Sequence, residues 1–359
     1  MNPYDIQIEA LNADAMARAE ARQSALAKPP KSLGVLEEIS IRWAGITNGK
    51  TDGAKKRRVL IFAADNGVVA EGVASAPQSV TLAQTINFAR GLTGVAVLAK
   101  HYHTELDIID VGVNASFAYP GVRDCKIAMG TKNIAREPAM TRQQALRAID
   151  VGRAAAHRAA QDGMDVIGIG EMGIGNTTTS SAILSCLLNL PAAETVGRGG
   201  GVNDAGFARK KQIIDDAIAR MQPDPDDIVD VLSKIGGFDI AAMCGAFLGA
   251  AERRLPVVID GYISAVAALC AYRINAKCAD YCFASHVSAE RGYALAIREM
   301  QLKPMLLLEM RLGEGSGCPI AFEIIDSALT VLRDMATFEE ARIDDHYLAE
   351  IRAERRFQR

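Results

Sequence analysis

The stretch Val166-Ile-Gly-Ile-Gly-Glu-Met-Gly-Ile-Gly-Asn-Thr-Thr-Thr-Ser180 joins an apolar run to closely spaced glycines and a polar segment. The apolar residues Val166 to Ile169 predict a buried strand, and the residues from Ser180 onward predict a helix. Glycines let backbone N–H groups approach an anion, and a helix N-terminus favours negative charge. Asn176 or Thr177 is expected to cap that helix, which would place the neighbouring hydroxyls beside a bound phosphate. The stretch therefore predicts a strand, an anion-binding turn and a helix.

The same glycines admit a second interpretation. Gly168, Gly170 and Gly173 match the G-x-G-x-x-G fingerprint of dinucleotide-binding folds. Glu171 would then lie inside the turn that must hold a pyrophosphate, where its negative charge is unfavourable. The acid expected further along the chain is also unconvincing, because Glu194 follows a proline and precedes a glycine cluster. The sequence thus favours a phosphate-binding turn with an acid beside it, and an NAD-dependent dehydrogenase is the less favoured alternative.

The composition is that of an ordinary globular protein. Of 359 residues, 49% are hydrophobic and 23% are charged, and the net charge of -3 gives no reason to expect nucleic acid or an anionic membrane as partner. The start of the chain lacks the basic and apolar regions of a signal peptide, and no uncharged run could span a bilayer. Seven cysteines scattered through apolar segments are typical of reduced thiols. We therefore expect a cytoplasmic protein, and no motif indicates a metal or another cofactor.

Apolar runs that alternate with helical patterns suggest the fold class. Strands are predicted at residues 57–64, 106–111, 166–169, 255–260 and 281–288. This alternation predicts an α/β protein with a parallel, doubly wound sheet. Both terminal segments are predicted to be helical, including a charged amphipathic helix over residues 335–359. We expect residues 1–40 and 322–359 to form a small helical domain, and residues 41–321 to form the α/β substrate-binding and catalytic domain.

Two further glycine-rich loops carry charged side chains. Gly197-Arg-Gly-Gly-Gly-Val-Asn-Asp204 contains Arg198, and the helix after it contains Lys210, so basic groups accompany a second possible anion site. Arg311-Leu-Gly-Glu-Gly-Ser-Gly317 places Glu314 between glycines at the start of a helix. A helix N-terminus lowers the pKa of a carboxyl group and apolar walls raise it, so Glu314 is a candidate general base. Together these loops suggest group transfer at a phosphorylated sugar.

Three polar residues keep two interpretations each. Asp65 follows a predicted strand, where it would either bind a ligand or cap a turn. Lys28 would either reach an acidic or phosphate group or remain solvated beside its turn. His286 ends another predicted strand, where a structural role is favoured over a catalytic one.

These motifs resemble those of the nicotinate-nucleotide:5,6-dimethylbenzimidazole phosphoribosyltransferases. The matching segments follow in order through nearly the whole chain: residues 28–34, 62–81, 166–180, 197–204, 236–251, 256–268, 285–292 and 311–317. The resemblance implies a Rossmann-like parallel sheet, a small domain of helices from both termini, and a homodimer. It also implies transfer of the 5-phosphoribosyl group of nicotinate mononucleotide to 5,6-dimethylbenzimidazole, giving α-ribazole 5′-phosphate and nicotinate. This reaction makes the lower ligand of cobalamin and inverts C1′, as expected of direct displacement with one base.

The resemblance also implies roles for individual residues. Glu314 would be the general base that takes the proton of the benzimidazole nitrogen, and Glu171 would line the same pocket. The substrate-binding positions it implies are Gln84, Leu312 and Gly313 at the edge of the base site; Gly173, Ile174, Gly175, Asn176 and Thr177 at the phosphate and ribose, with Gly199, Gly200 and Lys210 nearby; and Asp260 and Ser288 near the ribose or nicotinate.

Some positions depart from the pattern of the family. Lys31 stands where glycine is common, and Asn66 replaces a frequent histidine. None of the departures removes the proposed base or the phosphate loop. They leave the acceptor open, because relatives use other benzimidazoles, adenine or phenols. The alternative from another class is a catalytically silent nucleotide-binding subunit, which the presence of both Glu171 and Glu314 disfavours.

Overall fold

The computed structural model describes residues 6–349 and 351. The chain divides into two compact units: a larger one of residues 1–9 and 56–321, and a smaller one of residues 10–55 and 322–359. In these described parts of the chain, no helix combines the length and the apolar character needed to cross a membrane.

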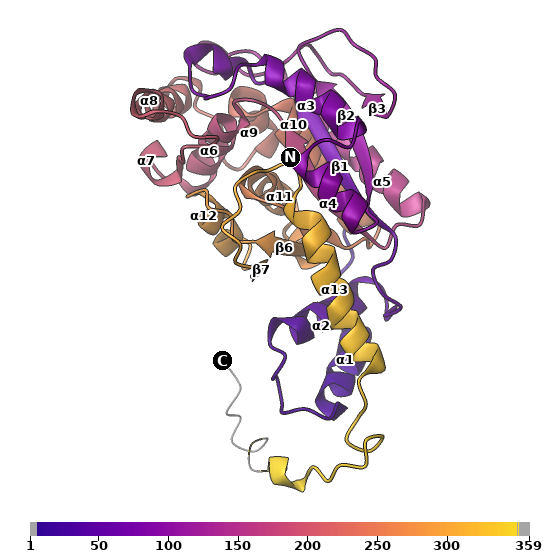
Figure 1. Ribbon diagram of the computed structural model, residues 1–359. Coiled ribbons are helices and arrows are strands. Elements are labelled where there is room, and N and C mark those ends of the chain that lie inside the picture. The colour runs from indigo at the N-terminus through magenta and orange to yellow at the C-terminus, as the bar shows by residue number, and fades with distance from the viewer. Residues whose placement is uncertain (1–5, 350, 352–359) are drawn as a thin grey trace. The chain divides into compact units, whose positions relative to one another are not determined.

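The larger unit is built on a seven-stranded sheet with the strand order β3-β2-β1-β4-β5-β6-β7 (Figure 1). Every neighbouring pair is parallel. The strands are β1 (Arg57–Ala64), β2 (Glu105–Gly112), β3 (Val122–Asp124), β4 (Val166–Met172), β5 (Val257–Ile259), β6 (Cys282–His286) and β7 (Pro304–Leu306). β1 is buried from Val59 to Ala64, as expected of a strand covered on both faces. The parallel, doubly wound fold predicted from the sequence is confirmed.

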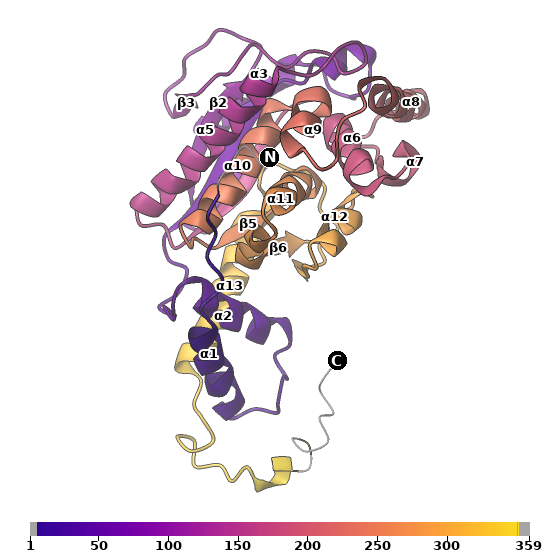
Figure 2. The ribbon, with the colours of Figure 1, turned by 180° about the vertical axis from the view of Figure 1, so that it is seen from behind.

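Helices cover both faces of this sheet. α3 (Ser79–Ala89) and α4 (Gly94–His101) lie on the face seen in Figure 1. α5 (Arg142–Gln161), α10 (Phe238–Glu252) and α11 (Tyr262–Ile274) lie on the face seen in Figure 2. The other helical elements of this unit are η1 (Gly67–Glu71), α6 (Asn176–Leu188), α7 (Ala192–Thr195), α8 (Asp204–Met221), α9 (Ile228–Ile235), η2 (Ala276–Tyr281) and α12 (Tyr293–Glu299).

Glycines bring α5 and α10 into backbone contact. A Cβ atom on Gly245 would lie 1.9 Å from the carbonyl oxygen of Ile149, and one on Gly152 would lie 1.7 Å from that of Ala242. No side chain fits at either position, so α10, a helix of small residues, packs directly on α5.

α5 begins with a capping box, in which Thr141 and Gln144 exchange hydrogen bonds between side chain and backbone.

The strand order creates one point where the direction of winding reverses. The chain adds β2 and β3 on one side of β1 and then returns to place β4 on the other side. The loops after β1 and β4 therefore leave the sheet in opposite directions and open a crevice at the carboxyl ends of the strands. Open α/β sheets bind their ligands at this position.

The smaller unit combines α1 (Ala13–Ala25), α2 (Val35–Ile46) and the part of α13 (Gly317–Asp334) beyond residue 321. Ala19, Ala44 and Leu332 form its buried core. Lys28 is buried, and its Nζ lies 2.7 Å from Glu37 Oε1. Of its two interpretations, contact with an acidic group is therefore the correct one.

The described part of the predicted C-terminal helix over residues 335–359 is largely not helical. Residues 335–345 carry no helix, and His346–Leu348 form the short η3. The backbone here pairs with the last residue of α1 and the segment after it instead: Ala27 donates to the carbonyl of Ala336 at 2.9 Å, and Phe338 donates to that of Ala25 at 3.1 Å. These bonds satisfy backbone groups that a helix would have used, so the prediction is wrong over this segment. Residues 350 and 352–359 lie outside the described residues.

Candidate active site

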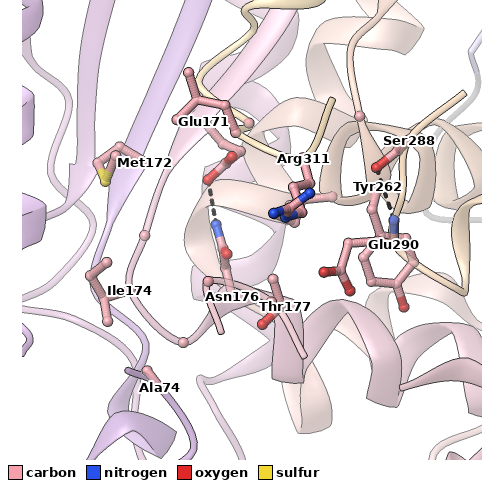
Figure 3. Close-up of a pocket in the computed structure, with 18 of the residues that line it drawn as sticks. Ala74, Glu171, Met172, Ile174, Asn176, Thr177, Tyr262, Ser288, Glu290 and Arg311 are labelled. Atoms are coloured by element: carbon pink, nitrogen blue, oxygen red, sulfur yellow. Dashed lines mark hydrogen bonds between the residues drawn. The ribbon is translucent and has the colours of Figure 1, made fainter. Parts of the chain in front are cut away.

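A cavity of about 190 Å³ lies at the carboxyl ends of the central strands, within the larger unit. The loops that follow β1, β4, β5, β6 and β7 line it (Figure 3). Most residues predicted for the site share this cavity: Glu171, Gly173, Ile174, Gly175, Asn176, Thr177, Gly199, Gly200, Asp260, Ser288, Leu312 and Gly313. The topology thus brings together a lining that runs from Val73 to Gly313, residues more than half of the sequence apart.

The turn between β4 and α6 forms one wall of the cavity. β4 continues to Met172, three residues beyond the predicted strand, and α6 begins at Asn176. The cap of α6 is Gly175, with φ of 94°, so the predicted cap at Asn176 or Thr177 is wrong. A competing interaction explains the difference, because the Asn176 side chain points back toward Glu171. The open N-terminus of α6 still faces the cavity as a helix terminus suited to an anion.

The dinucleotide fingerprint does not form a phosphate-binding turn. Gly168 and Gly170 lie inside β4, where they pair with Val59 and Ile61 of β1. A Cβ atom on Gly170 would lie 2.5 Å from the carbonyl oxygen of Glu314, so this glycine makes room for a neighbouring loop. Two of the three fingerprint glycines therefore serve sheet packing, which is unlike the dinucleotide-binding turn that the dehydrogenase alternative requires.

Glu314 sits on a tightly bent loop. Gly313, Glu314 and Gly315 all have positive φ, at 83°, 66° and 85°. The Glu314 side chain is buried, and its Oε2 accepts a hydrogen bond from the backbone of Val95 at the start of α4, at 3.1 Å. Its Oε1 lies 3.4 Å from Nε2 of Gln84, so these two predicted residues are neighbours, and neither is among the residues that line the cavity. Burial raises the pKa of Glu314, and these N–H donors oppose the rise.

Glu171 shares its surroundings with Asp239, a carboxylate that our sequence analysis missed. Nδ2 of Asn176 lies 2.5 Å from Glu171 Oε2 and 3.1 Å from Asp239 Oδ2 (Figure 3 shows the first contact). Burial and the nearby Asp239 raise the pKa of Glu171 to about 8, so this carboxyl is largely protonated near neutral pH. Burial also raises the pKa of Asp239 to about 6. The sequence signal that points to Asp239 is its position as an acid in the first turn of a largely apolar helix, α10.

Asp260, at the end of β5, contacts the loop of Glu314. Its Oδ2 accepts from the backbone N–H of Gly315 at 3.0 Å, and its Oδ1 accepts from that of Gly317 at 2.7 Å. Burial raises the pKa of Asp260 to about 7, although these donors lower it. His286 also lines the cavity; its Nδ1 contacts Ser285 Oγ at 2.9 Å, and burial lowers its pKa.

The basic residues near the cavity differ in whether a ligand in the cavity could contact their charged groups. Lys210 is fully buried behind the wall, where Nζ lies 2.8 Å from Thr177 Oγ1, and burial lowers its pKa to about 8. Arg198 lines the cavity but is paired with Asp204. Arg311 is exposed and projects into the cavity, and within the described chain it has no salt bridge (Figure 3). The sequence patterns predict no role for Arg311, although it opens the segment that carries Glu314.

Asp65 lies at the end of β1 and has a structural contact. Its Oδ2 accepts a hydrogen bond from the backbone N–H of Asn114 at 2.7 Å, so it holds the turn after β2. Of the two interpretations of Asp65, the structure supports the one in which its carboxylate caps a turn.

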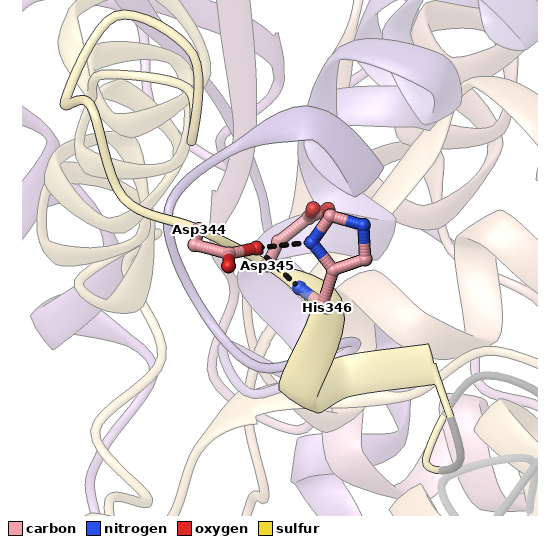
Figure 4. Close-up of side chains that lie close together, drawn as sticks. All are labelled: Asp344, Asp345 and His346. Carbon is pink, nitrogen blue, oxygen red and sulfur yellow. Dashed lines mark hydrogen bonds and ion pairs between the residues drawn. The ribbon is translucent and has the colours of Figure 1, made fainter.

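A separate group of possible metal ligands lies in the smaller unit. Asp344, Asp345 and His346 bring their donor atoms together in an exposed segment (Figure 4). Three successive residues of one turn come close through local geometry, since Asp344 Oδ1 also accepts the backbone N–H of His346. The group belongs to a different unit from the cavity.

Comparison with known proteins gives a consistent result. A family model described as Phosphoribosyltransferase matches residues 8–343. The nicotinate-nucleotide–dimethylbenzimidazole phosphoribosyltransferase of Clostridium perfringens strain ATCC 13124 is 52% identical over 347 residues, which cover 97% of this chain and 96% of the relative. The protein of that name from Clostridium tetani is 44% identical over 347 residues, 96% of each chain. The crystal structure of the protein of that name from Thermus thermophilus gives a TM-score of 0.88 at 37% identity, covering 93% of this chain and 99% of the other.

Proposed function

The chain belongs to the nicotinate-nucleotide–dimethylbenzimidazole phosphoribosyltransferase family, and we propose that it performs the reaction of that family in the cavity beside Glu314. It is a pentosyltransferase of cobalamin lower-ligand synthesis, which moves the phosphoribosyl group of nicotinate mononucleotide to dimethylbenzimidazole. A direct displacement that uses one base inverts C1′, so the products would be α-ribazole 5′-phosphate and nicotinate.

We assign the phosphate of the donor to the turn between β4 and α6. Gly173 lets this turn pack against the end of β1 and Asp239, because a Cβ atom there would lie 2.6 Å from the carbonyl oxygen of Ala64 and from Asp239 Oδ2. The N-terminus of α6 supplies N–H groups and a favourable dipole. Gly199 and Gly200 also line the cavity, and a Cβ atom on Gly199 would lie 2.9 Å from Thr177 Oγ1. Lys210 supports the turn through Thr177 without lining the cavity.

Glu314 is the proposed general base. Nitrogen of the acceptor attacks C1′ with its lone pair while the C1′–N bond to nicotinate breaks, and that electron pair returns to the pyridine nitrogen. The proton of the second acceptor nitrogen passes to Glu314. The Glu314 carboxylate can accept this proton because, within the described chain, its Oε1 receives a single hydrogen bond. That bond comes from Gln84 and is long, at 3.4 Å. The raised pKa of Glu314 increases its affinity for this proton.

Arg311 is the proposed partner of the nicotinate carboxylate. Nicotinate mononucleotide carries two anionic groups, and the turn before α6 takes the phosphate. Of the basic residues discussed above, Lys210 and Arg198 already have partners, whereas Arg311 projects into the open space. A guanidinium binds a carboxylate through two parallel hydrogen bonds, so Arg311 would favour nicotinate over nicotinamide.

The observation that carries this proposal is a buried Glu314 directly after Gly313 of the cavity wall, in a cavity that the N-terminus of α6 also lines. The test uses purified protein, nicotinate mononucleotide and a panel of benzimidazoles, adenine and phenols, with products identified by chromatography and mass detection. We expect a benzimidazole α-riboside phosphate together with free nicotinate. Binding of the mononucleotide without product from any acceptor would instead support a catalytically silent subunit.

We also propose a homodimeric, cytoplasmic enzyme. None of the seven cysteines forms a disulfide bond within the described residues, which suits a reducing compartment. The dimer is proposed from the family resemblance. Light scattering of the purified protein tests it, and a mass equal to one chain would contradict it.

A further inference from the structure

The loop that carries the proposed base has an unusual backbone. Three successive residues, Gly313, Glu314 and Gly315, adopt positive φ, although glutamate has a side chain that disfavours this region. Such a conformation persists only where surrounding contacts hold it. The contacts that hold this loop therefore decide where the carboxylate of Glu314 points.

Asp260 supplies two of these contacts. Its two carboxylate oxygens accept the N–H groups of Gly315 and Gly317, at 3.0 and 2.7 Å. Asp260 is itself fixed, because its backbone N–H donates to Ser264 Oγ at 3.2 Å and its carbonyl accepts from Ser285 Oγ at 2.9 Å. The carboxylate thus joins β5 to the start of α13, where a negative charge is favourable.

The sheet limits the loop from its other side. A Cβ atom on Gly170 would meet the carbonyl oxygen of Glu314 at 2.5 Å, and one on Gly315 would meet Val59 Cγ1 at 2.8 Å. The loop therefore lies directly on β4 and β1. With the sheet below it and Asp260 holding two of its N–H groups, Glu314 is directed toward Val95 at the start of α4.

We propose that Asp260 is a positioning residue, whose carboxylate holds the loop 313–317 in the conformation that aims Glu314 at the acceptor. This inference rests on the proposed role of Glu314 as the base. It differs from the expectation that Asp260 binds the ribose or nicotinate, because both of its oxygens already accept backbone N–H groups. Asp260 then affects the rate of transfer through Glu314 and leaves donor binding unchanged.

The test compares Asp260→Asn with a matched control, Asp110→Asn. Asp110 is also a buried carboxylate near the end of a strand. Its Oδ1 accepts the N–H groups of Gly112 and Val113 at 3.0 and 2.8 Å, and its Oδ2 pairs with Lys126 Nζ at 2.6 Å. Asparagine presents one oxygen, so it can hold only one of the two N–H groups at position 260. We expect kcat of Asp260→Asn to fall on the order of 10²-fold with KM for nicotinate mononucleotide changed less than about threefold, and kcat of Asp110→Asn to stay near wild type.

A double-mutant cycle separates positioning from a general loss of structure. If Asp260 acts through Glu314, adding Asp260→Asn to Glu314→Gln should cost less than about threefold further, because the base is already lost. Should Asp260→Asn not fold, Asp260→Glu takes its place in both backgrounds, since it keeps the charge and displaces the oxygens.

Two results would overturn the inference about Asp260 and leave the proposed role of Glu314 standing. One is a rise in KM for nicotinate mononucleotide with unchanged kcat, which would identify Asp260 as a donor-binding residue. The other is an equal loss from the Asp260 substitution in both backgrounds. A Glu314→Gln enzyme with the wild-type rate would instead reject the proposed base, and the inference with it. The three outcomes are therefore distinguishable.

Discussion

The side-chain amide of Asn176 lies 2.5 Å from the carboxyl group of Glu171 and ties the first turn of α6 to the end of β4. The same amide nitrogen reaches Asp239 at 3.1 Å. One donor thus serves two buried carboxyl groups, which stay close together because at least one of them holds a proton near neutral pH.

Glu314→Gln should remove the base while keeping the shape of the side chain. We expect kcat to fall on the order of 10²- to 10⁴-fold, the usual contribution of a general base, with little change in KM for nicotinate mononucleotide. Steady-state kinetics measure both constants. Glu309→Gln is the control, because Glu309 is an exposed carboxylate in the same segment of chain. Equal rates of the Glu314→Gln and wild-type enzymes would contradict the assignment.

The activity of the wild-type enzyme should fall as the pH is lowered. A base works only when it is ionised, and burial raises the pKa of Glu314 above the ordinary value for glutamate. The acid limb of kcat/KM should therefore lie at a higher pH than an exposed glutamate would give. The pH profile of kcat/KM measures this limb, and a flat profile down to the ordinary range of glutamate would count against Glu314.

Glu171→Gln should change how stability depends on pH. The folded protein raises the pKa of Glu171 from 4.5 to about 8 and that of Asp260 from 3.8 to about 7, so the folded state binds these protons more tightly than the unfolded state does. The free energy of unfolding should therefore decrease as pH rises from about 4 to about 8. Glu171→Gln should flatten the decrease above pH 7. Urea unfolding at pH 5, 7 and 8.5 measures this, and equal slopes in both proteins would refute it.

Asn176→Ala should destabilise the fold. It leaves Glu171 and Asp239 without their shared donor, which costs about 1–3 kcal/mol for buried polar groups. Chemical unfolding at constant pH measures the loss. Asn114→Ala, which truncates an exposed side chain, should stay within about 0.5 kcal/mol of wild type. A similar small effect at both positions would show that the Asn176 amide contributes little.

Arg311→Gln should weaken the preference for nicotinate mononucleotide. Loss of a hydrogen bond to a charged group predicts a rise in KM of roughly 10- to 100-fold, with kcat nearly unchanged. The KM for nicotinamide mononucleotide should not rise, because that molecule lacks the carboxylate. Arg198→Gln is the matched control, since this cavity residue already pairs with Asp204. An equal rise in KM for both mononucleotides would assign Arg311 to the phosphate instead.

The sequence by itself determined the class of the fold and the main elements of the site. Apolar runs alternating with helical patterns indicated the parallel sheet, because each signal is local to a few residues. Glycines beside Glu171 and Glu314 marked the two loops for the same reason. The motif resemblance indicated the reaction.

Only the tertiary structure decided which groups meet and in what state. Asp239 is distant in sequence from Glu171, and no local pattern shows that both contact Asn176. The cap of α6 moved to Gly175 because Asn176 has a stronger partner across the turn. Lys210 has its partners inside the wall, whereas Arg311 projects into the cavity. These outcomes depend on burial and on contacts between distant strands, which the order of residues along the chain does not specify locally.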